Sequence, residues 1–242
     1  METKHKVITE NELKDYFMIK QKGDYFNVNL SNITKPIFIR LPFVLNEEVA
    51  SLVGLMPDGS LIKDLMRIYF SQKKDDSKIE LFNDLIIKLF SNKVILFRKI
   101  GTRGDKQIYI NSKTLAWFFY YILKVPKSDE QVRIPTWIFD SPNNIKIEYL
   151  KQAFDMEGTI LKKLTEIRFV TKHDLFANDI KKLLSSLNME SHITFTPRPK
   201  QKSGQYRVSI YKKENFIKFK DIGFRIPFLK DRFEKLLLKY NI

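Results

Sequence analysis

"DGSL" at residues 58–61 is matched by "EGTI" at residues 157–160, 99 positions further along the chain. Each stretch is an acid, a glycine, a small hydroxyl residue and an aliphatic residue. Each closes a segment with the character of an apolar helix, "VASLVGLM" (49–56) in the first case and "NNIKIEYLKQAFDM" (143–156) in the second. Because a helix without a polar face is buried on most sides, we expect two buried helices that each end at one carboxylate.

Both helices are preceded by start signals. Asn46 is a suitable N-cap for the first helix, and Glu47 and Glu48 fall in its first turn, where the helix dipole favours anions. For the second helix we expect Ser141 as the N-cap and Pro142 at the first helical position.

The segments after the two helices also correspond. "IYFSQKKD" (68–75) and "IRFVTKHD" (167–174) again differ by 99 positions, and each alternates apolar and polar residues as a strand does. Each half then continues with a helix, two strands joined by a basic turn that contains glycine, and a third helix. The expected segments are 78–90, 93–100, 106–112 and 114–123 in the first half, and 174–187, 192–199, 205–211 and 214–224 in the second.

This order predicts an α+β chain with two pseudo-symmetric αββαββα repeats and antiparallel sheets. We place an N-terminal extension at 1–45, the first repeat at 46–135 and the second at 136–242. Pseudo-two-fold packing would pair the apolar helices at the interface and bring their two acids together. The N-terminal extension contains two short strands around a glycine turn, and it either lengthens a binding surface or braces the first repeat.

The composition restricts the class of protein. The 242 residues carry a formal net charge of +15, which indicates a polyanionic partner, most often nucleic acid and less often an anionic membrane surface. The alternative is a lysine-rich surface with no partner. The chain has no cysteine, which excludes disulfides, thiolate zinc sites and a cysteine nucleophile. No signal peptide and no apolar run long enough for a membrane span are found, so we expect a soluble, intracellular, cytoplasmic protein.

"SLVGLMPDGS" (51–60) and "EYLKQAFDMEGT" (148–159) resemble the two signature helices of the LAGLIDADG homing endonuclease family in its single-chain, two-repeat form. "RIPTWIFDSPNNIKIEYLKQAFDMEG" (133–158) also resembles the run into the second signature of inteins and intron endonucleases. The resemblance covers about residues 46–240. It implies sheets that form a DNA-binding saddle, and cleavage across the minor groove that leaves 3′ overhangs.

The two signatures depart from the family pattern at the base of the helix pair. The family usually has a glycine five positions before the acid and a small residue just before it. Here Gly54 lies four positions before the first acid and Pro57 occupies the small position, while Gln152 and Met156 stand at the equivalent places of the second signature. We expect this base to be less tightly packed than usual, or repacked.

The resemblance, together with the chemistry of phosphodiester hydrolysis, assigns Asp58 and Glu157 as catalytic metal ligands. A divalent cation activates water and neutralises charge, and Mg²⁺ (or Mn²⁺) prefers carboxylate oxygens, waters and phosphate oxygens. The alternative for each acid alone is an ordinary turn after a helix.

Other polar residues resemble the family's positions near the metal. Gln72 and Lys73 at the end of one strand resemble such a position, and Thr171 and Lys172 are their counterparts. "VRIP" (132–135) and "FRIP" (224–227) each contain an arginine, Arg133 and Arg225. Both arginines lie near the family's usual catalytic lysine and could stabilise an oxyanion. The alternative for each is a solvated surface charge.

Strand alternation predicts the DNA-binding residues of the sheet faces. In "MRIYFSQKK" it puts Arg67, Tyr69, Ser71 and Lys73 on one face, and a solvated sheet face of this composition can enter a major groove. The basic hairpins predict further contacts to phosphates or outer bases, from Arg103, Lys106, Arg198, Lys200 and Lys202. The expected DNA-binding residues are Arg67, Tyr69, Ser71, Arg98, Arg103, Lys106, Arg168, Arg198, Lys200, Lys202, Arg207 and Lys212.

The sequence therefore predicts a metal-dependent, site-specific double-strand DNA endonuclease that acts as a monomer. A second hypothesis is a nucleic-acid-binding protein on the same fold that has lost cleavage, either a maturase that binds intron RNA or a DNA-binding regulator. A third is a basic structural protein without a specific partner.

Overall fold

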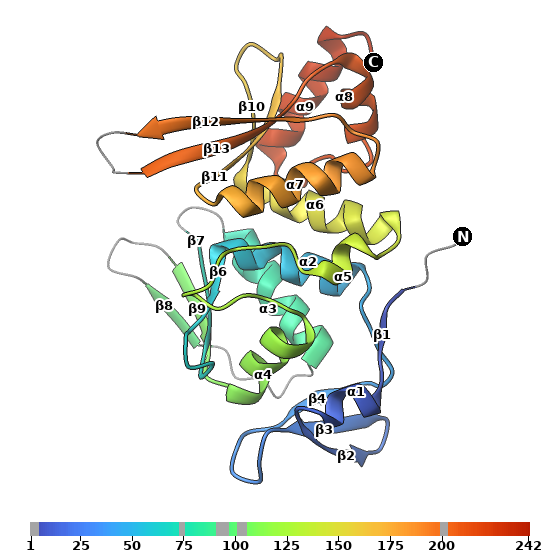
Figure 1. Ribbon diagram of the computed structural model, residues 1–242, viewed down its shortest axis with the longest axis vertical. Coiled ribbons are helices and arrows are strands. Elements are labelled where there is room, and N and C mark those ends of the chain that lie inside the picture. Colours follow the sequence, from blue (N-terminus) through green and yellow to red (C-terminus); the bar gives the residue numbers. More distant parts are fainter. Residues whose placement is uncertain (1–4, 73–75, 91–96, 101–105, 199–202) are drawn as a thin grey trace. The chain divides into compact units, whose positions relative to one another are not determined.

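The computed structural model describes residues 5–72, 76–90, 97–100, 106–198 and 203–242 (Figure 1). Within these ranges, the side chains of Asp58, Asp76, residues 97–100, Arg198 and Ser203 are not described. The chain divides into two compact units, Met1–Gln131 and Val132–Ile242.

The first unit contains the first αββαββα series. Its elements are α2 (Glu47–Leu55), the 3-10 turn η1 (Met56–Asp58), β6 (Gly59–Leu61), β7 (Ile68–Gln72), α3 (Asp76–Phe90), β8 (Phe97–Ile100), β9 (Lys106–Ile110) and α4 (Lys113–Trp117), which continues as the π-helical turn η2 (Phe118–Ile122).

The second unit repeats this series. Its elements are α5 (Thr136–Phe139), α6 (Asn143–Glu157), β10 (Gly158–Ile160), β11 (Ile167–Thr171), α7 (Asp174–Ser186), β12 (His192–Arg198), β13 (Ser203–Ile210), α8 (Lys213–Phe219) and α9 (Pro227–Lys239). The predicted α+β class and the predicted order of elements in both repeats are confirmed.

The two four-stranded sheets have the same topology. Their strand orders are β6-β7-β9-β8 and β10-β11-β13-β12, and every pairing is antiparallel. The register is also repeated, since Gly59 pairs with Phe70 in one sheet and Gly158 with Phe169 in the other. An offset of 99 in sequence therefore corresponds to the same place in the two sheets.

Helices cover one face of each sheet because alternate strand residues are apolar. In the first unit the ring of Phe70 stacks on Phe82 of α3 at 4.8 Å between ring centroids. In the second unit Phe169 contacts Phe154 of α6 and Phe176 of α7, both at 5.5 Å. These buried layers leave the opposite face of each sheet open.

The first signature helix begins as predicted. The Asn46 side chain accepts a hydrogen bond from the Val49 amide, and every residue from Val49 to Leu55 is buried. The predicted start of the second signature helix is wrong by one residue. Pro142 is the N-cap of α6, and the hydroxyl of Ser141 instead donates to the Trp137 carbonyl at 2.7 Å. The Ser141 hydroxyl is therefore bonded to the short helix α5 that precedes it and does not cap α6.

The N-terminal segment folds onto the first repeat. Its elements are β1 (Val7–Ile8), α1 (Glu10–Lys14), β2 (Met18–Lys22), β3 (Tyr25–Asn29), β4 (Ile37–Ile39) and β5 (Phe43–Val44). Strands β2, β3 and β4 form a three-stranded sheet, which includes the two predicted strands, and β1 pairs with β5. Phe43 joins the core of the repeat by packing on Phe90 and Phe118.

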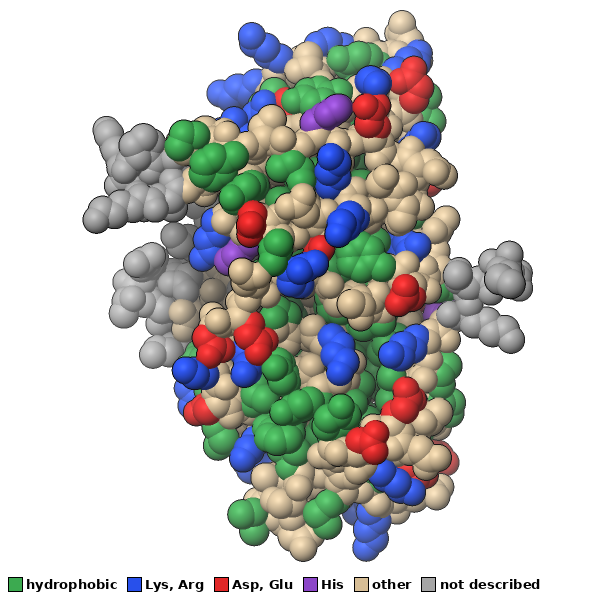
Figure 2. Space-filling model, viewed as in Figure 1, with side chains coloured by type: hydrophobic (Ala, Val, Ile, Leu, Met, Phe, Trp, Pro, Cys, Tyr) green, Lys and Arg blue, Asp and Glu red, His purple; other side chains and the backbone are tan. Residues whose placement is uncertain are grey.

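The aromatic run at 117–121 is mostly core, as predicted, although a π-helical turn was not expected. Phe118 and Phe119 are fully buried. Tyr121 stacks with Tyr16 and Trp117 at the surface, where hydrophobic side chains gather over α4 (Figure 2). Among the helices of the described ranges, none has both the length and the apolar character that crossing a membrane requires.

Candidate nucleic-acid interface and acid positions

Each predicted acid lies at the junction between a signature helix and the first strand of its sheet. Glu157 is the last residue of α6, and Gly158 begins β10. Asp58 is the last residue of η1, and Gly59 begins β6. The two acids therefore occupy the same place in their respective units. The side chain of Asp58 lies outside the described part of the structure.

The glycine after each acid is required by close approach. A Cβ at Gly158 would lie 2.2 Å from the Phe154 carbonyl oxygen. A Cβ at Gly59 would lie 2.9 Å from Cε of Met56 and 3.0 Å from the Tyr69 carbonyl oxygen. Only glycine lets the chain turn from helix to strand directly after the acid without displacing these atoms.

The backbones that carry the two acids differ. The first signature helix stops at Leu55, and Pro57 lies in the 3-10 turn that leads to Asp58. The second remains α-helical through Glu157. Gln152, which stands where the family usually has glycine, is buried, and its Oε1 accepts a hydrogen bond from Nη1 of Arg225 at 3.0 Å.

The two arginines of the "RIP" stretches are ion-paired within the second unit. Arg225 also donates to Glu148 of α6 at 2.5 Å, and its backbone amide donates to the buried carboxylate of Asp155 at 3.0 Å. Arg133 binds the buried carboxylate of Asp179 through Nε at 2.6 Å and Nη2 at 2.9 Å. This bond raises the pKa of Arg133. Both guanidinium groups thus tie their loops to helices.

The other residues predicted near the acids lie at strand ends. Gln72 ends β7 and Thr171 ends β11, each two positions beyond the partner of the glycine that follows an acid. Thr171 is buried, and its hydroxyl oxygen accepts from the His173 amide at 3.2 Å. Lys172 is exposed, and Lys73 lies outside the described residues.

The open face of the first sheet is polar and aromatic. Tyr69 and Ser71 alternate with the buried Ile68 and Phe70, as predicted. Across the sheet Tyr69 pairs with Tyr109, and Ser71 pairs with Gln107. Lys106 pairs with Gln72, and alternation puts it in line with Ile108 and Ile110 rather than with Tyr109.

Arg67 is held on this face by aromatic and amide groups. Its guanidinium carbon lies 5.5 Å from the Tyr69 ring centroid and 5.2 Å from that of Tyr109. Nη1 donates to the Tyr69 hydroxyl at 2.7 Å, and Nε donates to the Asn111 side chain. Cation–π contacts and hydrogen bonds together fix the orientation of a planar donor.

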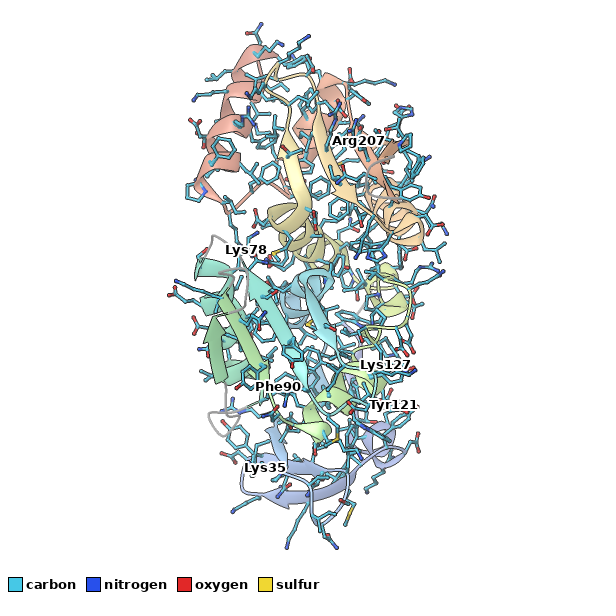
Figure 3. All side chains as sticks on the ribbon, turned by 90° about the vertical axis from the view of Figure 1, so that its left-hand side faces the viewer. Lys35, Lys78, Phe90, Tyr121, Lys127 and Arg207 are labelled. Carbon is cyan, nitrogen blue, oxygen red and sulfur yellow. The ribbon has the colours of Figure 1, made fainter. Side chains whose placement is uncertain are left out.

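The open face of the second sheet is polar and mostly hydroxylic. The register aligns Arg168 with Ser209, and Arg207 with Val170 and Thr194. Arg207 is labelled on β13 in Figure 3. Lys212 follows β13 and is paired with Glu190 at 2.6 Å.

Glu166 takes the place in the second repeat that Arg67 has in the first, because each precedes the first residue of the second strand. Glu166 is buried and paired with Arg168 at 2.5 Å. Burial acts to raise the pKa of Glu166, but hydrogen bonds from Arg168 and Ser209 outweigh it, so the pKa lies below its usual value. The first repeat thus has an arginine held by two tyrosine rings where the second has the ion pair of Glu166 with Arg168.

Several residues predicted to bind DNA cannot be placed. Arg103, Lys200 and Lys202 lie outside the described residues, as do the side chains of Arg98 and Arg198. Sequence reasoning missed Gln107, Tyr109 and Asn111, although the alternation of β9 would have indicated the first two. Asp179, the partner of Arg133, carries no local signal, whereas Glu166 lies two residues before Arg168 and strand alternation puts the two on one face.

The donor chemistry at the two junctions fits a divalent cation. Each offers a carboxylate at the C-terminal end of a helix, where the dipole disfavours an anion and favours a cation. Hard oxygen donors of this kind suit Mg²⁺. The described side chains, which do not include Asp58, contain no group of three or more His, Asp or Glu residues positioned for a metal ion.

Residues 144–222 match the family model of the LAGLIDADG-like domain. Among curated proteins, the chain is 24% identical over 206 residues to the probable translation initiation factor IF-2 of Methanocaldococcus jannaschii, covering 84% of this chain and 17% of that protein. It is 29% identical over 172 residues to a DNA polymerase of Pyrococcus horikoshii, covering 71% and 12%. The chain thus spans less than a fifth of either relative, and the two relatives are named for different activities.

Two solved structures show the same fold. The homing endonuclease I-DmoI in complex with DNA and Ca is matched with a TM-score of 0.56 at 18% identity, covering 78% of this chain and 97% of that one. The homing endonuclease I-WcaI bound to its DNA recognition sequence is matched with a TM-score of 0.52 at 15% identity, covering 78% and 87%. Residues 144–222 thus carry a LAGLIDADG-like domain, and the chain shares the fold of these two single-chain homing endonucleases.

Proposed function

We propose that this chain is a site-specific double-strand DNA endonuclease that acts as a monomer and uses Mg²⁺ or Mn²⁺. The observation that carries the proposal is the repeated arrangement of an acid at a helix–strand junction beside a sheet with an open polar face. The related structures support it, since I-DmoI is found in complex with DNA and Ca or Mn, and a substituted variant of it with target DNA in the presence of Mg.

In this proposal Asp58 and Glu157 hold the metal, one acid from each repeat. A bound divalent cation supplies water activation and charge neutralisation. Gln72 and Thr171 orient groups beside the acids, and Lys73 and Lys172 add positive charge near the scissile phosphates. Arg133 and Arg225, whose side chains remain 48% and 43% exposed beside their ion pairs, stabilise charge from these positions.

The open sheet faces bind DNA. Arg67, Tyr69, Ser71, Arg168 and Arg207 contact base edges or phosphates from described positions. The proposed contacts further include Arg98, Arg103, Lys106, Arg198, Lys200, Lys202 and Lys212. Lys106 is not on the open face and would reach DNA from the end of β9. The net charge of +15 favours such a polyanionic partner. We take 46–135 and 136–242 as the two repeats and 1–45 as an extension of the first.

A second candidate function is a nucleic-acid-binding protein without cleavage, such as a maturase that binds intron RNA or a DNA-binding regulator. The specific observation in its favour is the unequal support of the acids, a 3-10 turn with Pro57 under Asp58 and an α-helix under Glu157. Metal chemistry depends on how precisely the backbone holds each acid, so unequal support favours a chain that binds without cleaving.

The two candidates are separated by cleavage of a plasmid library with randomised targets in Mg²⁺ or Mn²⁺. The chain is compared with Asp58→Asn and Glu157→Gln, and with Glu80→Gln on the exposed face of α3 as a matched control. The nuclease produces discrete cuts that both site variants abolish and the control keeps. No cuts, with DNA or RNA binding retained, would favour the second candidate.

A further inference from the structure

The loop between β3 and β4, residues 30–36, is built as an ordered turn. The Thr34 amide donates to the Ser31 carbonyl at 3.2 Å, and the Thr34 hydroxyl contacts the Asn29 side chain. The Leu30 amide donates to Asn29 Oδ1 at 3.1 Å. At the tip, Ile33 is 95% exposed. These hydrogen bonds within the turn hold its outer residues in a fixed position.

A buried threonine fixes this loop to the first repeat. Thr114, in the first turn of α4, is fully buried, and its hydroxyl donates to the Lys35 carbonyl at 2.8 Å. The same hydroxyl lies 3.4 Å from the side chains of Asn29 and Thr34. The loop therefore moves with α4, and α4 follows directly from the sheet strand β9.

The loop also continues the open face of the first sheet. Arg67 on that face binds Asn111, which directly follows β9, and Lys113 and Thr114 come next along the chain. In Figure 1 the β3–β4 loop extends to the same side as β6–β9, and Lys35 lies on that side in Figure 3. The backbone from Asn111 to Thr114 therefore connects the Arg67 site to the loop, through the bond of Thr114 to the Lys35 carbonyl. The Lys113 ammonium on this segment lies 5.9 Å from the centroid of the Trp117 ring.

Two cations, one in the loop and one on this segment, have no acidic neighbour. Among the described residues, neither Lys35 nor Lys113 is within 4.0 Å of a carboxylate, and both are exposed. Ser31, Asn32 and Thr34 add hydroxyl and amide groups. Lysines, hydroxyls and amides are the groups that contact phosphate and sugar oxygens.

We propose that the loop at residues 30–36, with Lys113, is a further binding site for duplex DNA that lengthens the interface beyond the edge of the first sheet. This inference rests on the proposed function. It adds a contact to DNA from the N-terminal extension, which precedes both repeats. The contacts of the loop are to the DNA backbone, so the loop adds length and register to binding without selecting bases.

Photocrosslinking tests the proposal directly, because the chain has no cysteine and a single introduced one can be labelled cleanly. Ile33→Cys carries the reagent on the loop. Leu238→Cys, at 73% exposure on α9, is the matched control. Thr194→Cys carries the reagent on the open face of the second sheet and tests whether the chain binds DNA as the proposed function expects. The probe is a random-sequence duplex of about 40 base pairs at low salt.

The proposal expects crosslinks from positions 33 and 194 and none from 238. Crosslinks from 194 alone would overturn it and leave the proposed function standing. No crosslink from any position would reject the proposed function as well. Crosslinks from 33 to duplex RNA of the same length, with none to DNA, would also overturn it.

A salt titration gives an independent measure. Lys35→Gln with Lys113→Gln removes two charges, and the dependence of log affinity on log salt should become shallower by about 1.8. The matched pair Lys181→Gln with Lys182→Gln, exposed on α7, should leave the slope within about 0.5 of the unaltered chain. Equal slopes for the two pairs would contradict the proposal.

Discussion

The guanidinium of Arg67 is oriented before any partner binds. Two tyrosine rings flank it and Asn111 accepts from it, so few rotamers remain to be lost on association. An arginine fixed in this way can meet the two acceptors of a guanine edge in a major groove. Arg168, which takes the place in the second repeat that Tyr69 has in the first, is instead held by Glu166.

Substitution of Arg67 by alanine should relax base preference at one position of the target by about 1 to 3 kcal/mol. The reason is the loss of a pre-oriented donor, and the measurement is selection from a randomised duplex library. Arg168→Ala is the matched comparison. It should lower stability more than it alters base preference, because it leaves Glu166 buried without its partner. If the Arg67 and Arg168 variants alter base preference equally, this distinction between the two arginines is wrong.

Glu166 should make the stability of the second repeat depend on pH. Its pKa in the folded chain lies below the ordinary 4.5, so acid protonates the unfolded chain first. The stabilisation is complete above that ordinary value and is lost as pH falls through the lower folded value. The free energy of unfolding should therefore fall more steeply below about pH 5 for the unaltered chain than for Glu166→Gln.

That comparison uses denaturant unfolding at a series of pH values. At neutral pH the Glu166→Gln chain should be less stable by about 1 to 3 kcal/mol, because the bonds to Arg168 and Ser209 weaken. Glu80→Gln on α3 should keep the slope of the unaltered chain. If the stability of the Glu166→Gln chain falls with pH as steeply as that of the unaltered chain, Glu166 does not govern the loss of stability in acid.

At the scale of elements, the junction between α6 and β10 is the most constrained place in the second unit. Gly158→Ala would put a methyl group 2.2 Å from a carbonyl oxygen, so the strand or the last helical turn must shift. We expect a loss of at least about 2 kcal/mol in the free energy of unfolding. Thr159→Ala, one residue later, should cost less than about 1 kcal/mol. Calorimetry or denaturant titration compares the two.

The pair between Arg133 and Asp179 joins the loop before α5 to α7. Asp179→Asn keeps the shape of the side chain and removes its charge, and we expect a loss of about 2 kcal/mol in stability. Cleavage rates at a temperature where all variants are folded separate structure from catalysis. If Arg133 only anchors its loop, Arg133→Met and Asp179→Asn lower the rate alike. A much larger loss for Arg133→Met would support an oxyanion role.

The order of elements followed from the sequence because it depends on local patterns. Alternation in 68–72 and 167–171, and the repeated offset of 99, predicted strands that the structure contains at those residues. The cap at Asn46 was also predicted, since its partner is three residues away. Ser141 misled because it lies between the end of α5 and the start of α6, and its hydroxyl bonds back to the Trp137 carbonyl of α5.

The ion pairs of the candidate site could not be predicted in this way. Arg133 and Asp179 are 46 residues apart, and Arg225 and Glu148 are 77 apart. Neither spacing has a period that links the partners, so only the folded chain brings them together. The placement of Asp58 and Glu157 as metal ligands stays a prediction, as does the pairing of the two signature helices.

At the scale of the whole molecule, the charge of +15 sets the response to salt. If binding neutralises about 6 to 10 phosphates, affinity for duplex DNA should fall by about 10³ to 10⁵ between 50 and 200 mM salt. Fluorescence anisotropy with a labelled duplex measures this directly. An affinity that does not change with salt would point to a partner that is not a polyanion.

Arg67 and Glu166 occupy matching places in a fused pair of repeats, and fusion changes what a mutation can do. In a dimer of identical chains, a single codon change would alter both surfaces at once. Here a change at position 67 alters one surface and leaves its twin as it was. The two halves can therefore carry different side chains at equivalent places, and positions 67 and 166 have opposite charge.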